Sequence, residues 1–192
     1  MPVVMEEVVE RLAQRSSELF FGKYRGVVTD NNDPEGLARI KVQVPAVMGE
    51  TEVGWCLPAL PFAGDGHGLV MLPEVASMVW VEFEAGSVDF PIWTGCFFTP
   101  GQRPSPAATG ARLIASVRGH KLLLDDDGDT VLIEHSGGAR IELSMTAITL
   151  EVLGSKIEMG AAAISFNNGV VKIGPAGVAL ANGAMTLGVP PT

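Results

Sequence analysis

The densest group of potential metal ligands is an acidic run, Asp125–Asp129, in which four aspartates accompany Gly128. Hard cations such as Ca²⁺ bind several carboxylates, so the run could hold one. A calcium loop of the EF-hand type that began at Asp125 would need glycine and glutamate where Thr130 and Ser136 stand. Apolar triplets flank the run, and Asp-Gly is a typical pair for a hairpin turn. We therefore predict a turn here and no metal site.

The three histidines, His67, His120 and His135, are the residues best suited to acid–base chemistry. None is spaced with a second histidine, a cysteine or a carboxylate as metalloprotease or zinc-ribbon motifs require. His135 follows Glu134, and this pair could act in catalysis only if folding brought a nucleophile to it. We predict surface or turn positions for the histidines, and no catalytic, cofactor-binding or metal-binding residue.

Cysteines, tryptophans and a glycine-rich stretch give weaker signals. Cys56 and Cys96 are too few for a disulfide framework or a four-ligand zinc site, and we expect buried free thiols. Residues 64–68 lack the Gly-Lys-Ser/Thr ending of a phosphate-binding loop, so a mobile loop is expected. The tryptophans could stack on sugars or bases, but no basic residues accompany them, which favours core or subunit-interface packing; they are Trp55, Trp80 and Trp93.

The composition indicates a folded β protein that does not bind nucleic acid. The chain of 192 residues is 47% hydrophobic and only 6% aromatic, with 23 glycines and 13 prolines, as expected for many short strands separated by turns. A net charge of −9 argues against a phosphate-backbone partner, which needs clustered lysine and arginine. The sequence contains neither a signal-like start nor a run of 18 apolar residues, so synthesis in the cytoplasm is expected.

The first 21 residues are predicted to contain a short amphipathic helix. Val4, Val8 and Leu12 recur at helical spacing, with glutamates early and arginines late, the order that favours the helix dipole. The apolar stripe could pack on its own domain or on symmetry-related copies. Alternatively, it is a contact for a separate hub protein.

Residues 22–98 are predicted to form a small barrel. Short apolar segments alternate with turn sequences such as Asn31–Gly36 and Gly64–Gly66, and five or six strands in this length favour an oligonucleotide/oligosaccharide-binding (OB) fold. The expected strands are Lys23–Thr29, Ala38–Val44, Val53–Leu60, Gly68–Leu72, Met78–Phe83 and Pro91–Phe98. Residues 99–116 follow as a connector rich in proline and glycine.

Residues 117–192 contain an internal repeat. Apolar–X–apolar triplets begin at residues 141, 148, 157, 164, 171, 178 and 185, and turn residues separate them. In a strand, the first and third residues of each triplet lie on the same face. We expect these fourteen residues to form a core: Ile141, Leu143, Ile148, Leu150, Ile157, Met159, Ile164, Phe166, Val171, Ile173, Val178, Leu180, Met185 and Leu187.

Such a repeat is typical of a solenoid whose units cannot bury their apolar faces alone. Three-residue strands in a lone chain would leave open edges, whereas three intertwined chains would pair every edge. We therefore predict an obligate homotrimer whose C-terminal part is a three-chain, triple-stranded β-helix. A single-chain acyltransferase solenoid would show hexapeptide periods and a catalytic histidine, whereas residues 141–192 have a period of seven and no histidine. A carbohydrate-binding barrel on a trimeric fibre stalk is the other alternative.

Several segments resemble, in the same order, the phage baseplate assembly protein V and Vgr-type spike proteins of contractile injection systems. In the barrel region they are residues 20–28, beginning Phe20-Phe21-Gly22-Lys23-Tyr24, and residues 33–42, 55–58, 72–84 and 91–95. Gly119–Gly128 followed by Val131–His135 resembles the strand pair that opens the β-helix in that family. The resemblance covers about residues 20–187 and implies a trimeric, non-enzymatic spike that punctures a target membrane on firing.

The resemblance also implies partners. Larger members of the family carry a hub domain before the barrel, and some carry a lysozyme domain or a C-terminal effector; here we expect the hub to be a separate polypeptide. Some short relatives end in a His-x-His tip that binds iron, whereas this sequence ends Val189-Pro190-Pro191-Thr192. These four residues are therefore expected to contact a separate tip protein of the PAAR-repeat kind. The spike would be assembled in the baseplate of a phage-like particle and delivered to a target envelope.

Overall fold

A computed structural model of the chain describes residues 5, 7–10 and 19–188. The chain divides into two compact units, Met1–Gln102 and Arg103–Thr192. Met5 and residues 7–10 are helical, as the N-terminal pattern predicts, while the rest of that predicted helix up to residue 18 lies outside the described residues. No helix in the described part of the chain is long and apolar enough to cross a membrane.

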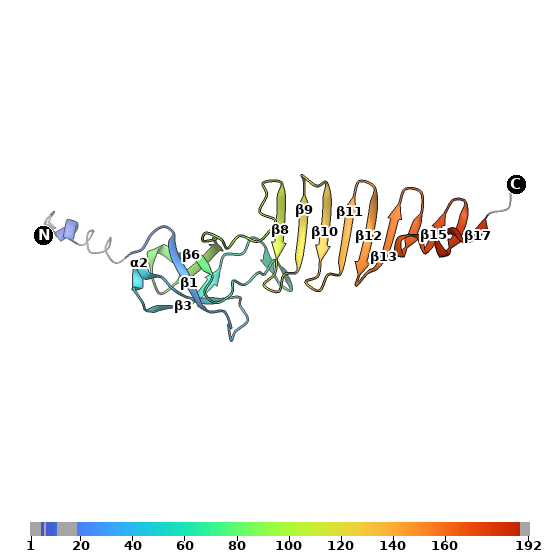
Figure 1. Cartoon of the computed structure of the whole chain (residues 1–192). Coiled ribbons are helices and arrows are strands. Elements are labelled where there is room, and N and C mark those ends of the chain that lie inside the picture. The colour runs from blue at the N-terminus through green and yellow to red at the C-terminus, as the bar shows by residue number, and fades with distance from the viewer. Residues whose placement is uncertain (1–4, 6, 11–18, 189–192) are drawn as a thin grey trace. The chain divides into compact units, whose positions relative to one another are not determined.

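Unit 1 is a closed five-stranded barrel with the strand order β1-β2-β3-β7-β6 (Figure 1). The strands are β1 (Tyr24–Asp30), β2 (Ile40–Gln43), β3 (Glu52–Pro58), β6 (Met78–Phe83) and β7 (Pro91–Cys96). Neighbours pair antiparallel except β3 with β7, which run parallel and close the barrel. Helix α2 (Pro45–Met48) joins β2 to β3, and a 3₁₀ turn, η1 (Glu84–Gly86), follows β6. The predicted OB-like barrel is confirmed.

Alternation along the strands builds the barrel core. In β6 every second residue is buried, so that Val79, Val81 and Phe83 face the interior. Residues from the other strands, together with Val44 directly after β2, complete the core, which comprises Val28, Ile40, Val42, Val44, Val53, Cys56 and Trp93 besides those of β6. Phe20 and Tyr24 pack on Phe83 with ring centroids 6.2 and 5.7 Å from it. This aromatic cluster fixes the point where the chain enters the barrel.

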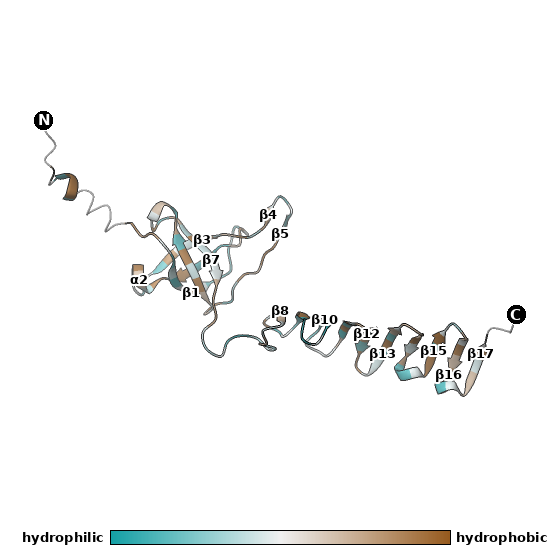
Figure 2. Ribbon diagram, turned by 90° about the horizontal axis from the view of Figure 1, so that it is seen from above, coloured by the Kyte–Doolittle hydropathy of each residue, from teal (hydrophilic) through white to brown (hydrophobic). Residues whose placement is uncertain are grey.

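A long segment between β3 and β6, residues 59–77, departs from the predicted pattern; we call it the barrel arm. It contains only the two-residue strands β4 (Ala63–Gly64) and β5 (His67–Gly68), which pair with each other. The strand expected over Gly68–Leu72 is absent, because this apolar run has no partner strand beyond β5 and lies exposed. In Figure 2 the β4–β5 hairpin projects from the rest of the barrel.

Unit 2 is a ten-stranded antiparallel sheet in which each strand pairs with its neighbours in sequence (Figure 1). Its strands are β8 (Ala111–Ala115), β9 (Lys121–Asp125), β10 (Thr130–Glu134), β11 (Arg140–Ser144), β12 (Ala147–Val152), β13 (Ser155–Gly160), β14 (Ile164–Phe166), β15 (Val171–Gly174), β16 (Gly177–Leu180) and β17 (Met185–Gly188). Strand β8 lies inside the predicted connector. Among the described residues, the ladder edges expected to be open in a lone chain are paired within the chain, except the outer edges of β8 and β17.

The spacing of the repeat follows from its hairpins. A seven-residue step accommodates a short strand and a tight turn, as from β14 to β15 with three ladder pairs. The one nine-residue step falls between β12 and β13, which are longer and share six ladder pairs. Two turns contain short 3₁₀ segments, η2 (Asn167–Gly169) and η3 (Ala181–Gly183), whose residues all have positive φ. Asparagine and glycine tolerate this conformation best, which explains their recurrence.

Candidate trimer interface

The register of the sheet brings the fourteen triplet residues into two continuous columns on one face. Ile141 pairs with Leu150, Leu143 pairs with Ile148, and every later strand pair repeats this pattern. The columns also extend into the first three strands of the sheet. One runs Ile114, Leu122, Ile133, Ile141, Leu150, Ile157, Phe166, Val171, Leu180, Met185; the other runs Arg112, Leu124, Val131, Leu143, Ile148, Met159, Ile164, Ile173, Val178, Leu187. We call this surface the apolar face.

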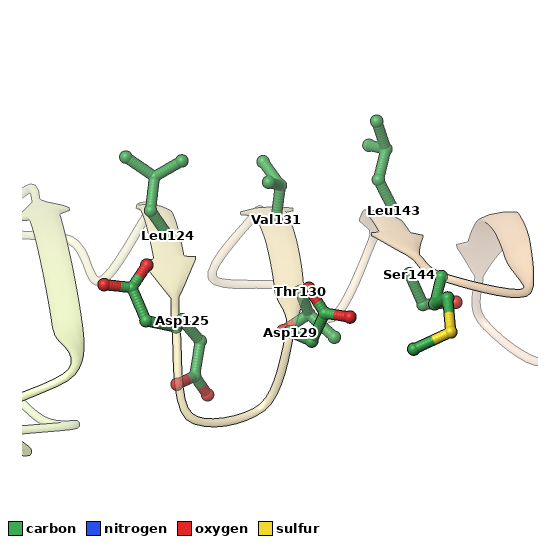
Figure 3. Close-up of a pocket in the computed structure, with 9 residues that line it drawn as sticks. Leu124, Asp125, Asp129, Thr130, Val131, Leu143 and Ser144 are labelled. Carbon is green, nitrogen blue, oxygen red and sulfur yellow. The ribbon is translucent and has the colours of Figure 1, made fainter.

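The apolar face is uncovered in a single chain. None of the fourteen triplet residues is buried, and Ile173 and Leu187 are 44% and 64% exposed. Figure 3 shows Leu124, Val131 and Leu143 pointing to the same side from three neighbouring strands. Soluble monomers rarely leave a contiguous apolar surface of this extent open. The face is therefore built for contact with another surface.

The opposite face of the sheet is polar and internally paired. Arg140 on β11 forms an ion pair with Glu151 on β12 at 3.0 Å, and Lys121 on β9 lies 3.8 Å from Glu134 on β10. These pairs lie across adjacent strands, where opposite charges favour the register. Leu123 and Thr149, which are buried, also belong to this face. Contact with solvent is therefore favourable for the polar face and unfavourable for the apolar face.

Two histidines that the sequence separates by fifteen positions stack at one margin of the apolar face. His120 and His135 flank the β9–β10 ladder, and their ring centroids are 4.5 Å apart. The amide of Ser136 donates to His120 Nδ1, and that of Gly137 donates to His135 Nδ1. Counting cross-strand residue pairs outward from the Asp127-Gly128 turn would have predicted that His120 lies opposite His135. Because both Nδ1 atoms already accept a hydrogen bond, the neutral rings carry their protons on Nε2 and present no free lone pair for a metal.

The acidic run forms the β9–β10 turn, as predicted. Asp125 ends β9, and its Oδ1 accepts a hydrogen bond from the amide of Gly128 at 3.1 Å. Arg112 pairs with Asp126 across the neighbouring strand. A shallow hollow of about 350 Å³ lies beside the turn (Figure 3). In the described residues no group of three or more His, Cys, Asp or Glu side chains could hold a metal ion.

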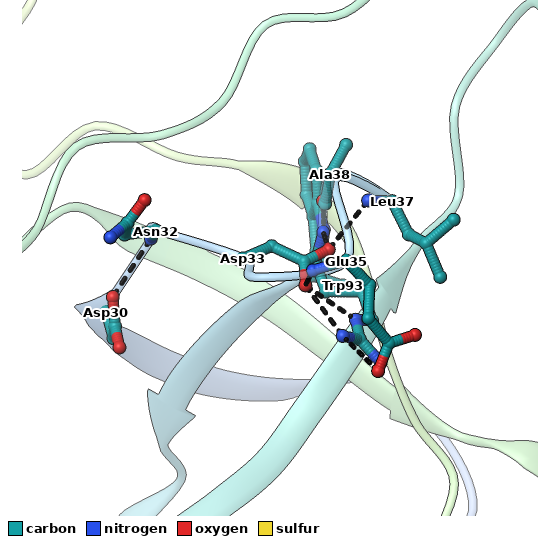
Figure 4. Close-up of polar contacts among 8 residues, drawn as sticks. Asp30, Asn32, Asp33, Glu35, Leu37, Ala38 and Trp93 are labelled. Atoms are coloured by element: carbon teal, nitrogen blue, oxygen red, sulfur yellow. Dashed lines mark hydrogen bonds and ion pairs between the residues drawn. The ribbon is translucent and has the colours of Figure 1, made fainter.

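In the barrel, the loop from β1 to β2 is organised by Asp33 (Figure 4). Its carboxylate accepts hydrogen bonds from the amides of Glu35, Leu37 and Arg39 and from the Arg39 guanidinium, whose closest nitrogen lies at 2.6 Å. The Arg39 side-chain bond is the largest influence, and it holds the pKa of Asp33 well below its usual range. Trp93 Nε1 donates to the carbonyl of Ala38 at 3.2 Å, which ties the loop to the core. The sequence predicted this loop only as a Pro-Gly turn, without the Asp33 network.

The three tryptophans have different surroundings. Trp93 is buried, whereas Trp55 and Trp80 are half-buried and carry basic neighbours, which the sequence spacing did not indicate. Lys41 Nζ lies 5.1 Å from the centroid of Trp55, and Arg25 lies 5.9 Å from that of Trp80.

Both cysteines are free thiols, as expected, but Cys56 is buried and Cys96 is exposed. The prediction of a buried thiol is therefore confirmed for Cys56 and wrong for Cys96.

The predicted partner contacts at the chain ends are described only in part. Val8 lies in the short helical stretch and is 40% exposed. Val4 and Leu12, the other expected hub contacts, lie outside the described residues, as do the expected tip contacts at 189–192. These contacts remain predictions.

Comparison with known families accounts for both units. The type VI secretion system/phage-baseplate injector OB domain matches residues 24–98, the barrel, and the phage baseplate V C-terminal trimerisation domain matches residues 112–186, the ten-stranded sheet. No curated protein matches the chain. The two families are structural baseplate domains, and the second supports a homotrimer. The chain therefore belongs to the phage baseplate assembly protein V family of spike-type structural proteins.

Proposed function

We propose that the protein is the membrane-puncturing central spike of a contractile injection system. Three copies bring their apolar faces together around a common axis, and the three sheets form a stiff β-helical needle. The observation that carries this proposal is the apolar face, two columns that continue from β8 to β17 with a polar, ion-paired face behind them. Continuous backbone pairing along the sheet supplies the stiffness that a needle needs.

Association of the three faces is driven by apolar burial. Each side chain that is transferred from water to such an interface contributes about 1.5–3 kcal/mol when it becomes fully buried. The consecutive antiparallel hairpins also count against the acyltransferase alternative, because a single-chain coil of that kind does not reverse direction at each strand. Nothing in this arrangement needs a reacting group, and the proposed work is mechanical.

The proposed spike links two other proteins. A hub or tube protein binds at the N-terminal end, where Val4, Val8 and Leu12 recur at helical spacing. A tip protein of the PAAR-repeat kind binds beyond β17, whose outer edge is unpaired within the sheet. An uncovered strand edge is a template for further pairing, so a cap also protects the needle from aggregation. The target membrane is met only on firing.

The test compares two neighbouring substitutions on opposite faces of β15. Val171→Asp places a charge on the apolar face, and Lys172→Asp places the same side chain on the polar face. We expect the unchanged chain and Lys172→Asp to have a trimer's mass in solution, and Val171→Asp to have a monomer's mass. A stable monomer for the unchanged chain, or an intact soluble trimer for Val171→Asp, would contradict the needle.

The proposed links are tested by co-purification from a producing cell. We expect a hub, a tube subunit and a tip protein to accompany the tagged chain. Removal of residues 189–192 should release the tip protein and leave the hub bound. Glycan binding that is lost in Trp55→Ala and retained in Trp80→Ala would instead support the carbohydrate-binding stalk. Trp93 is unsuited to that test because it belongs to the barrel core.

A further inference from the structure

We propose that the barrel arm, residues 59–77, is a second intersubunit contact that packs on a neighbouring copy of the same chain. The inference rests on the homotrimer of the proposed function. It concerns the barrel, whereas the apolar face belongs to unit 2. The family matches assign trimerisation only to residues 112–186.

The arm is an ordered structure on a fixed base. The amide of Ala59 donates to the carbonyl of Trp93 at 2.9 Å, and the amide of Ala76 donates to that of Val28 at 2.8 Å. Asn31 Nδ2 holds the carbonyl of Pro73 at 3.0 Å. At the outer end, the β4–β5 hairpin is closed by the bond from the amide of Leu69 to the carbonyl of Phe62. A segment held in this way can present a defined surface.

That surface is apolar and uncovered. The side chains of the run from Leu69 to Leu72 are between 40% and 57% exposed, and Phe62 and Val75 are exposed beside them. In the described part of the chain, the amides of Val70, Met71 and Leu72 donate no hydrogen bond. Figure 2 shows the arm projecting from the barrel. Exposed apolar residues in one contiguous run mark a docking site more often than scattered ones do.

The position of the arm indicates its occupant. The arm rejoins the barrel at Met78, whose carbonyl accepts the amide of Phe97, the first residue after β7. The arm therefore lies at the barrel end from which the chain continues to the trimerisation domain. The N-terminal segment enters at the other end of β6, where Phe20 packs on Phe83. The connector over residues 99–110 spans at most about 40 Å, so trimerisation keeps the other copies within reach of this end.

Charge counts against a lipid surface or nucleic acid as the occupant, and local concentration favours a neighbouring copy. Residues 22–98 contain four basic and ten acidic residues, a formal charge of −6, which repels an anionic lipid surface or nucleic acid. Tethering by the trimerisation domain gives neighbouring barrels an effective concentration in the ~mM range. A weak apolar contact is sufficient at that concentration. The neighbouring copy is therefore the partner that is present whenever the spike is assembled.

The experiment is hydrogen exchange on the full-length chain, followed at residues 70–72 by mass spectrometry. These amides have no acceptor within the chain and should exchange near the intrinsic rate in the Val171→Asp monomer. In the trimer we expect exchange to slow by about tenfold or more, because docking shields them. Val70→Asp should remove this protection while the chain keeps a trimer's mass. Phe90→Asp is the matched control, since Phe90 is exposed at the opposite barrel end.

The outcomes separate the two proposals. A trimer in which residues 70–72 exchange at the monomer's rate overturns the arm contact and leaves the needle intact. Equal loss of protection in Val70→Asp and Phe90→Asp also overturns it, because the effect would then not be local to the arm. A chain that does not trimerise at all contradicts the proposed function itself.

Discussion

Asp33 illustrates how one side chain can replace regular structure in a connection between strands. Its two oxygens accept five hydrogen bonds, from three backbone amides and two guanidinium nitrogens. The loop needs such a centre because Gly36 and Ala38 adopt positive φ, which no ladder enforces. The side chain of Asp33 is only 3% exposed, and that of Arg39 is 13% exposed. The ion pair between Asp33 and Arg39 holds the Arg39 guanidinium in place over the ring of Trp55.

Replacing Asp33 with asparagine should lower the melting temperature of the barrel and change its acid response. The folded-state pKa of Asp33 is depressed, chiefly by Arg39, so the ionised carboxylate stabilises the fold above its unfolded pKa of about 3.9. This contribution is lost as the pH falls below that value. Thermal unfolding between pH 7 and pH 2 should therefore show a steeper acid loss in the unchanged chain than in Asp33→Asn. Glu35→Gln, which removes a largely exposed partner of Arg39, should have a smaller effect; equal effects would contradict the role of Asp33.

The two thiols should react at very different rates. Burial raises the pKa of Cys56 to about 12, so it is almost wholly protonated at neutral pH and also inaccessible. Cys96 is exposed, and partial burial raises its pKa above the usual value without closing access. With a disulfide reagent at pH 8, we expect one thiol per folded chain to react and the second to react only in denaturant. Cys96→Ser should abolish the fast phase, and an unchanged fast phase would refute the assignment.

At the scale of the element, the two-residue turn between β12 and β13 sets the register of the longest hairpin in the repeat. Leu153 and Gly154 have φ of 47° and 86°, the conformation that matches the twist of paired strands. Gly154→Ala should destabilise unit 2 by about 1–2 kcal/mol per chain, because a side chain is strained there. Gly160→Ala, at the other end of β13, meets only ordinary contacts beyond 3.6 Å and should be nearly neutral. Denaturant titration followed by circular dichroism measures both, and similar losses would contradict the turn assignment.

The elements that the sequence predicts well are those with a strict period. Each triplet places a polar or small residue between two apolar ones, and its strand appears in the structure at the expected position. Strand β8 is harder to recognise from the sequence because the small residues Ala111 and Ala115 at its ends weaken the alternation of apolar and polar side chains. The strand predicted over residues 68–72 is absent for the opposite reason. It has the hydrophobicity of a strand, but a strand also needs a partner, and partnership depends on the closed barrel order and not on local composition.

At the scale of the whole molecule, the sequence predicts a barrel followed by a repeat of short strands, because a proline-rich connector separates two periodicities. It also predicts the fourteen triplet residues of the apolar face, but not the continuation of its two columns into β8, β9 and β10. The arm, the stacked histidines and the Asp33 network depend on register and loop closure, so they appear only in three dimensions. The premise that short strands leave edges open is wrong for this sheet. The apolar face, and not the ladder edges, is what requires other copies.

The tryptophans allow the two units to be followed separately during unfolding of the assembled molecule. All three lie in the barrel, so their fluorescence reports unit 1, whereas far-ultraviolet circular dichroism reports both units. Dissociation of three chains makes the stability of unit 2 depend on protein concentration, since mass action favours the trimer at higher concentration. Over a hundredfold range of concentration, we therefore expect the circular dichroism midpoint to rise. Because the apolar face carries few charges, raising the salt concentration should not lower this midpoint.

Fluorescence supplies the internal control for that experiment. If the barrel is stabilised mainly by its own core, its midpoint should move less with concentration than that of the sheet, and any residual shift should disappear in Val70→Asp, which removes the proposed arm contact. A circular dichroism midpoint independent of concentration would show that the ten-stranded sheet is stable alone. Such a result would contradict the apolar face as the surface on which the spike is built.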